Sequence, residues 1–180
     1  MGFWIFWIKS FNALSWSILV GENASSEFTG ISFAGEGQNL DTGAQVIHAA
    51  PNTKSTINTK SISKSGGIAI YRGLVDIKEN AVGAKNSTSC ESLMLDNISR
   101  SDTIPTIKIE NNDIDIGHEA KIGRISDSVI FYLMSRGISE QEAKEMVVRG
   151  FAEPIAKELP MEYAVEMNNL INLELVGSIG

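Results

Sequence analysis

Short runs of β-branched residues, separated by polar turns, fill residues 20–125 and restrict the folds open to this chain. Isoleucines alternate with other residues in pairs such as Ile68/Ile70 and Ile107/Ile109. This period-two alternation is typical of β-strands. Glycine, asparagine, aspartate and serine interrupt it every few residues. The segments that we expect to be strands are Gly30–Phe33, Gln45–His48, Ser55–Thr59, Ile68–Tyr71, Leu74–Ile77, Leu93–Leu95, Thr106–Glu110 and Asp113–Ile116.

These strands predict a mainly β body over residues 21–125. They are too short and too irregularly spaced for a propeller or an immunoglobulin domain. Short strands with tight polar corners suit the stacked turns of a β-helix, in which each turn buries its apolar positions on its neighbours. A β-sandwich is the alternative.

From Ser126 onward the pattern predicts a small α-helical domain of three or four helices, residues 126–180. Ser126-Asp127 can cap a helix over Val129–Arg136 that ends at Gly137. Ser139 and Glu142 form a capping box for a second helix, which Gly150 is expected to end. A third segment surrounds Pro154, and Pro160 starts the last helix. Its apolar residues follow helical spacing: Ala164, Met167, Leu170, Ile171 and Leu175.

The apolar stretch 1–20 holds one charge, Lys9, and all three tryptophans. Three interpretations stay open. The alternation of Trp16, Ile18 and Val20 favours a buried or edge strand pair. A membrane anchor fits less well, because polar residues interrupt the second half and no basic segment precedes the apolar run. The stretch can also be the start of an incomplete chain, with apolar surface that a missing neighbour would cover.

Charge and motifs exclude several function classes. The net charge is −7, and no run of lysine or arginine is present, so we expect neither nucleic acid nor a membrane as partner. Residues 126–180 carry 9 acidic and 4 basic residues, which suits a basic partner. The sequence lacks the P-loop, GxGxxG, HExxH, GxSxG and CxxC motifs. A single cysteine also rules out an intramolecular disulfide framework.

The remaining candidates for chemistry are Cys90 and the pair His118-Glu119. Thiolate, imidazole and carboxylate form a reasonable ligand set for iron or zinc. Cys90 and His118 are 28 residues apart, about one turn of a β-helix, so one face can hold both. The alternative is a buried structural cysteine and an ordinary surface histidine. His48 is expected to be structural. A sugar-cleaving β-helix enzyme would need paired carboxylates, for which Asp113-x-Asp115 offers only residues that flank a turn.

An ordered set of motifs resembles the SufB/SufD family, the scaffold subunits of the Suf machinery that assembles iron–sulfur clusters. Cys90-Glu91-Ser92-Leu93 and His118-Glu119-Ala120 resemble SufB more than SufD. The other matching segments are residues 41–43, 47–48, 52–57, 71–75, 123–125, 130–133, 135–138 and 159–166. The resemblance covers about residues 20–180.

The resemblance implies a right-handed parallel β-helix followed by a C-terminal helical domain. It implies a non-enzymatic, cytoplasmic scaffold within a SufBCD complex, where Cys90 accepts sulfur and binds a transient iron–sulfur cluster. His118 and Glu119 would complete that metal site. The ATPase would be a SufC-type partner docked on residues 126–180, and SufD or a second SufB would pair through the β-helix core. The alternative is a purely structural subunit that recruits SufC without holding a cluster.

Overall fold

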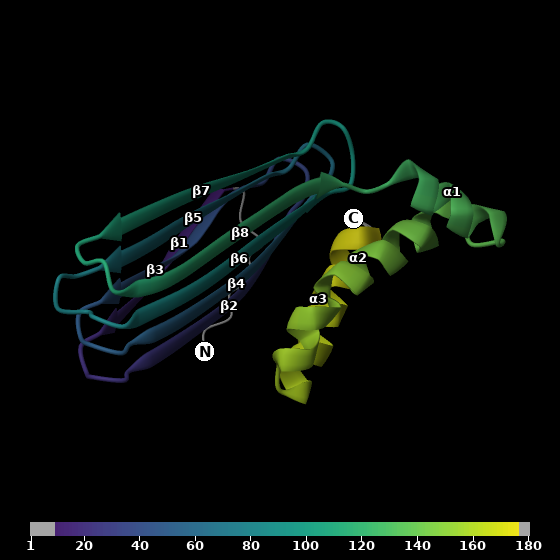
Figure 1. The fold of residues 1–180 in the computed structure, drawn as a ribbon. Helices are drawn as coiled ribbons and strands as arrows, with labels where there is room; N and C mark the ends of the chain where they lie inside the picture. The colour runs from purple at the N-terminus through teal and green to yellow at the C-terminus, as the bar shows by residue number, and fades with distance from the viewer. Residues whose placement is uncertain (1–9, 177–180) are drawn as a thin grey trace.

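The structure, a computed structural model, describes residues 10–176, with Ser10, Phe11 and Val176 described by their backbone alone. Eight strands precede three helices in this part of the chain (Figure 1). The strands are β1 Ser10–Leu19, β2 Ser25–Ala34, β3 Asn39–His48, β4 Lys54–Ser63, β5 Ile68–Ile77, β6 Ala84–Met94, β7 Arg100–Ile109 and β8 Ile114–Arg124. The helices are α1 Asp127–Ser135, α2 Glu140–Glu158 and α3 Met161–Val176.

The strands form a parallel β-helix with two flat faces. Odd-numbered strands make one sheet in the order β1-β3-β5-β7, and even-numbered strands make the other, β2-β4-β6-β8. Every pair is parallel, and each turn places a residue beside one about 30 positions later, as Ser10 beside Asn39 and Ile68 beside Arg100. Consecutive strands lie in opposite sheets (Figure 1). The mainly β fold and the β-helix are therefore confirmed, and the sandwich is excluded.

The interior of the β-helix is built by alternate residues of each strand, because successive side chains point to opposite faces. Its fully buried members include Val46, Ile57, Val75 and Ile77. Two of the expected short strands are in fact continuous: residues 68–71 and 74–77 join through Gly73 into β5. A Cβ on Gly73 would lie 3.3 Å from the Tyr71 ring, so the glycine leaves room for that ring instead of ending the strand.

The described part of the apolar N-terminal stretch is β1, the first strand in its sheet, so the strand interpretation is confirmed for residues 10–19. Residues 10–19 form one strand of the expected pair. Trp16 and Ile18 are 63% and 55% exposed on the outer face, whereas Ser17 points inward and accepts a hydrogen bond from Ser26. Residues 1–9 lie outside the described residues. No helix in residues 10–176 is long and apolar enough to cross a membrane.

The helices differ from the sequence prediction at two points. Ser126 is the N-cap residue of α1, but its side chain makes no capping hydrogen bond. The capping box of Ser139 and Glu142 is present. The break expected at Gly150 is wrong, because α2 runs through both Gly150 and Pro154 to Glu158. Proline within a helix removes one backbone hydrogen bond and crowds the carbonyl four residues earlier. Burial of the α2 face that carries Val148, Ala152 and Ile155 outweighs that cost, so the described residues contain three helices and not four.

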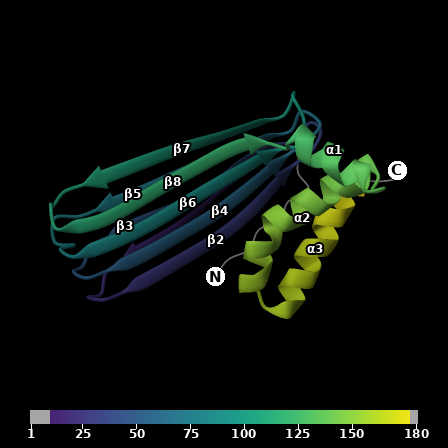
Figure 2. The ribbon, with the colours of Figure 1, turned by 45° about the vertical axis from the view of Figure 1, so that its right-hand side comes forward.

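Helices α2 and α3 cover the outer face of the β2-β4-β6 side, near the ends of the strands (Figures 1 and 2). The shared core joins side chains of the strands to the apolar faces of both helices. Its buried members are Ile62, Leu93, Leu95, Val148, Ala152, Ile155, Met167, Ile171 and Leu175. The helical region is thus fixed on the β-helix by an apolar core of its own. This arrangement sets the position of α2 behind strand β6.

Candidate functional site

Cys90, the chain's single cysteine, lies on β6 with its side chain inside the β-helix and 2% exposed. It packs in the core that also contains Ile57, Tyr71 and Val75. Burial raises the pKa of the thiol, and a hydrogen bond from Thr59, its register partner on β4, acts in the opposite direction. The thiol form is therefore favoured near neutral pH, and chemistry that needs the thiolate requires a nearby cation or metal.

His118 lies on β8, the neighbour of β6, and faces the same interior as Cys90. The register pairs Cys90 with Ala120 and Thr88 with His118, which makes Cys90 and His118 diagonal neighbours. Strand spacing and rise place their Cα atoms about 8 Å apart. The His118 Nε2 atom is buried and has no hydrogen-bond partner among the described residues. A buried imidazole nitrogen without a partner is costly, and it is free to bind a ligand.

Glu119 does not join Cys90 and His118. As the next residue on β8, it points to the outer face, where its carboxylate is 3.0 Å from the Lys121 ammonium and 63% exposed. Within this chain, the structure brings two of the three sequence-predicted site residues together. Residues 10–176 contain no group of three or more histidine, cysteine, aspartate or glutamate side chains arranged to hold a metal ion.

His48 occupies a buried polar network, in keeping with the structural role expected for it. Its ring is fully buried, with Nδ1 2.8 Å from Thr53 and Nε2 2.8 Å from Ser55. Thr53 donates its one hydroxyl proton to the Ala50 carbonyl, so it accepts from Nδ1. In the neutral ring Nε2 then accepts from Ser55, whose oxygen also accepts from Asn86. These directions assign the neutral tautomer with the proton on Nδ1. Burial lowers the pKa of His48, which favours the same neutral form.

Tyr71 is a neighbour of Cys90 that sequence reasoning missed. The side chain, on β5 of the opposite sheet, is 4% exposed, and its hydroxyl is buried. Burial and then the charge of Cys90 raise the pKa of this hydroxyl. An alternation of inward positions along residues 68–77 was the available signal, but the expected break within β5 hid it.

The last turn of the β-helix has an open side. β7 and β8 end their sheets in the described chain, and their inward apolar residues are partly exposed. Ile107 is 42% exposed, Ile109 51% and Ile122 49%. An unpaired strand edge with apolar side chains is a template for further strand pairing. Asp113 lies in the turn before β8, as expected of a residue that flanks a turn.

Comparisons with known proteins agree with this geometry. Residues 12–151 match the family described as SUF system FeS cluster assembly, SufBD core domain. The chain belongs to the SufBD family. It is 57% identical over 163 residues to iron–sulfur cluster assembly SufBD family proteins of Staphylococcus haemolyticus, Staphylococcus epidermidis and Staphylococcus aureus. Each alignment covers 91% of this chain and 35% of the relative, so the chain spans about a third of the length of these relatives.

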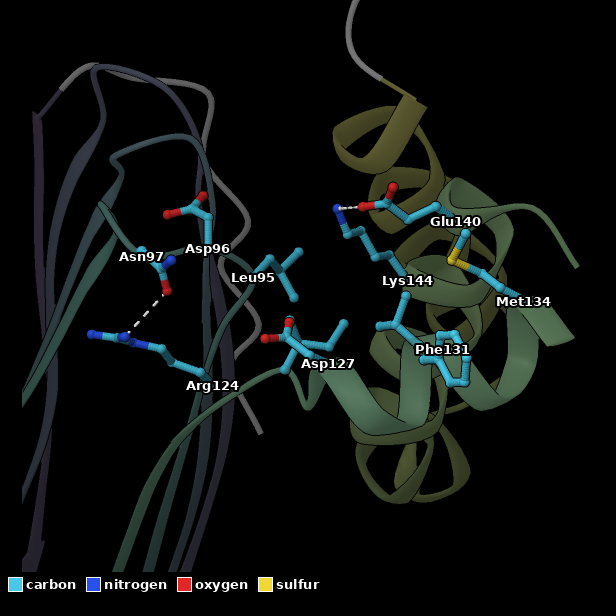
Figure 3. Close-up of a pocket in the computed structure, with 11 residues that line it drawn as sticks. Leu95, Asp96, Asn97, Arg124, Asp127, Phe131, Met134, Glu140 and Lys144 are labelled. Carbon is cyan, nitrogen blue, oxygen red and sulfur yellow. Dashed lines mark hydrogen bonds and ion pairs between the residues drawn. The ribbon is translucent and has the colours of Figure 1, made fainter.

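Membership of the SufBD family confirms the resemblance that the motifs gave, and it places Cys90 and His118 inside the matched segment. In this family member, a cleft of about 510 Å³ separates the last corner of the β-helix from α1 and α2 (Figure 3). Arg124 donates to Asn97 on one wall, and Lys144 pairs with Glu140 on the other. Phe131 of α1 lines the cleft and is 74% exposed. The cleft therefore combines charged side chains with apolar ones, among them the exposed Phe131 ring.

Proposed function

We propose that this chain is a scaffold segment on which iron and sulfur are brought together into a transient cluster, with Cys90 as sulfur acceptor and cluster ligand. The observation that carries the proposal is the diagonal placement of the Cys90 thiol and the unpartnered His118 imidazole on one inward face. The cluster is the cargo of such a scaffold and not a resident cofactor. A small number of protein ligands is suited to a cluster that has to be released to another protein.

The chemistry needs the Cys90 thiolate. The thiolate attacks the outer sulfur of a donor persulfide, forms a new S–S bond, and releases the donor as a thiolate. The resulting sulfur and the imidazole are both ligands that iron accepts in proteins. Because burial raises the pKa of Cys90, bound iron or another cation would promote the reactive form.

We retain Glu119 as a proposed site residue because its motif resembles that of SufB. Its outward carboxylate cannot reach the interior face of its own strand, since adjacent residues point to opposite sides. As a ligand it would act on the outer side of β8, together with groups of a partner chain. Loss of function on changing Glu119 is therefore expected only in an assembly that contains that partner.

Anaerobic reconstitution with ferrous iron and sulfide tests the scaffold role. Cys90→Ala is expected to lose most of the visible-region absorbance of a bound cluster, because one of few ligands is gone. His118→Ala should also lose absorbance, whereas Glu119→Gln, outside the shared face, should match wild type in the isolated chain.

Equal absorbance in wild type and in both the Cys90 and the His118 variants would contradict the site. If no protein develops absorbance, the purely structural subunit becomes the better explanation. One observation favours that second candidate: residues 10–176 hold no preformed three-ligand metal group.

We propose two protein partners as well. A SufC-type ATPase would dock on residues 126–180, and SufD or a second SufB would pair with the open edges of β7 and β8. The exposed aromatic surface of α1, the cleft beside it and the acidic excess of the region support the first. The partly exposed inward isoleucines of the last turn support the second. Such a complex is expected in the cytoplasm.

A point variant tests the ATPase contact without removing the helices, which complete an apolar core. Phe131→Glu should reduce co-purification with a SufC-type ATPase roughly tenfold or more, since a charge replaces an exposed aromatic contact. Ile98→Glu is the matched control, because Ile98 is equally exposed (75%) but lies on a β-helix corner. Binding that survives Phe131→Glu and falls with Ile98→Glu would place the contact on the β-helix instead.

A further inference from the structure

Two adjacent residue pairs on strands β4 and β6 connect Cys90 with helix α2, one pair facing the interior and the other facing outward. On β4 and β6 the register pairs Thr59 with Cys90 and, one residue on, Lys60 with Glu91. Successive residues point to opposite faces. Thr59 and Cys90 therefore meet inside the β-helix, and Lys60 and Glu91 meet directly behind them on the outer face. Thr59 and Lys60 are adjacent along β4, as are Cys90 and Glu91 along β6, so a backbone shift that moves the outer pair also moves the inner pair.

The outer pair is fastened to α2. The Lys60 ammonium makes an ion pair with the Glu91 carboxylate, and it lies over the Phe151 ring of α2 with 4.4 Å between Nζ and the ring centroid. The side chains of Lys60 and Glu91 are only 13% and 28% exposed. A cation held over an aromatic ring with restricted access to water is attracted more strongly than an exposed one. We call Lys60, Glu91 and Phe151 the α2 anchor.

Other contacts near the α2 anchor reach elsewhere. Lys121 lies 4.0 Å from Glu91, but it also pairs with Glu119 on β8 and is 61% exposed. Thr29 donates to Glu158 at the end of α2, at 3.2 Å, but Thr29 is on β2, two strands from Cys90. The apolar core also joins α2 to β6, through Leu93, three residues beyond Cys90. The α2 anchor reaches β6 at Glu91, the residue next to Cys90.

We propose that Lys60 is a positioning residue for Cys90. Through the α2 anchor it fixes strand β6 against α2, so that movement of the helix toward or away from the strands controls access to the thiol. A buried thiol reacts only when its surroundings open. While α2 stays packed against the strands, β6 keeps Cys90 covered. With Phe151 withdrawn from Lys60, the pair behind Cys90 loses its cover and β6 opens locally.

The inference rests on the proposed function only for the importance of Cys90, and its test needs no iron. Cys90 is the chain's single cysteine, so a maleimide under native conditions reports this thiol alone. Lys60→Met keeps the length of the side chain and removes its charge. Because this change removes the cation–π contact and the ion pair, maleimide labelling of the folded protein is expected to become roughly tenfold faster. Lys60→Arg keeps both contacts and should stay within about twofold of wild type.

Two measurements separate positioning from a general loss of stability. Thr29→Val loosens α2 away from Cys90 and should leave labelling within about twofold. Urea unfolding gives the global stability of each variant, and the labelling gain of Lys60→Met must exceed what that change accounts for. The proposal is overturned by unchanged labelling in Lys60→Met, by a gain no larger than the global destabilisation, or by an equal gain in Thr29→Val. Failure of cluster reconstitution with labelling as expected would overturn the proposed function and leave the coupling in place.

Discussion

Gly43→Ala is expected to lower the free energy of unfolding strongly. Gly43 lies in the middle of β3, where a Cβ would come within 2.1 Å of the Arg72 carbonyl oxygen on β5 and 2.8 Å of the Leu14 side chain. The backbone atoms of a sheet ladder cannot move aside as a flexible side chain can, so β3 and β5 have to separate. We expect a loss of roughly 3 kcal/mol or more in the free energy of unfolding, from overpacking and broken ladder hydrogen bonds.

Urea unfolding followed by circular dichroism measures this effect. Gly117→Ala is the matched control: it is also a strand glycine, on β8, and a Cβ there meets nothing within 4 Å. Its free energy of unfolding should stay within about 0.5 kcal/mol of that of wild type. Equal stability of the two alanine variants would show that the close approach of Arg72 does not constrain position 43.

Acidification from pH 7 to pH 5 is expected to destabilise the protein through His48. Burial lowers the pKa of this histidine in the folded state, so the unfolded chain, with a pKa near 6.5, binds the proton more readily. The stabilisation is fully present above the unfolded pKa and is lost as pH falls from about 6.5 through the lower folded value. Each unit of difference between the two pKa values contributes about 1.4 kcal/mol.

His48→Leu separates this contribution from other titrating groups. The variant should lose the His48 part of the pH dependence between pH 7 and 5. It should also be less stable at pH 7 by roughly 2–3 kcal/mol, because Thr53 and Ser55 lose their buried hydrogen-bond partner. Urea midpoints at several pH values give both quantities. A variant whose midpoint falls with acid as steeply as that of wild type would assign the pH dependence to other groups.

Local sequence signals predicted those features that depend on local chemistry. The capping box of Ser139 and Glu142 needs residues only three positions apart, and it is present as expected. The isoleucine alternation identified strands because a pleated backbone alternates its faces whatever surrounds it. The end of α2 was missed for the opposite reason. Gly150 and Pro154 weaken a helix in isolation, but the buried residues Val148, Ala152 and Ile155 hold it together.

For the candidate site too, local sequence signals predicted some features and only the tertiary structure revealed others. The spacing of 28 residues between Cys90 and His118 matched one turn of the β-helix closely enough to place both on one face. Glu119 was grouped with them because it adjoins His118 in sequence, but on a strand an adjoining residue points to the other face. Tyr71 and the α2 anchor come from other strands and from a helix about 60 residues beyond Cys90, and no local pattern indicates such contacts.

By itself, the sequence determined that this chain is a β-helix of the SufBD family with helices at its end, and that its candidate chemistry rests on Cys90 and His118. Turn residues, alternation and caps are short-range properties, so they can be read along the chain. Only the tertiary structure decided which side of each strand is buried, how far α2 extends, and which groups surround the thiol. Those features arise from packing between segments distant in sequence, where the burial of apolar surface outweighs local preference.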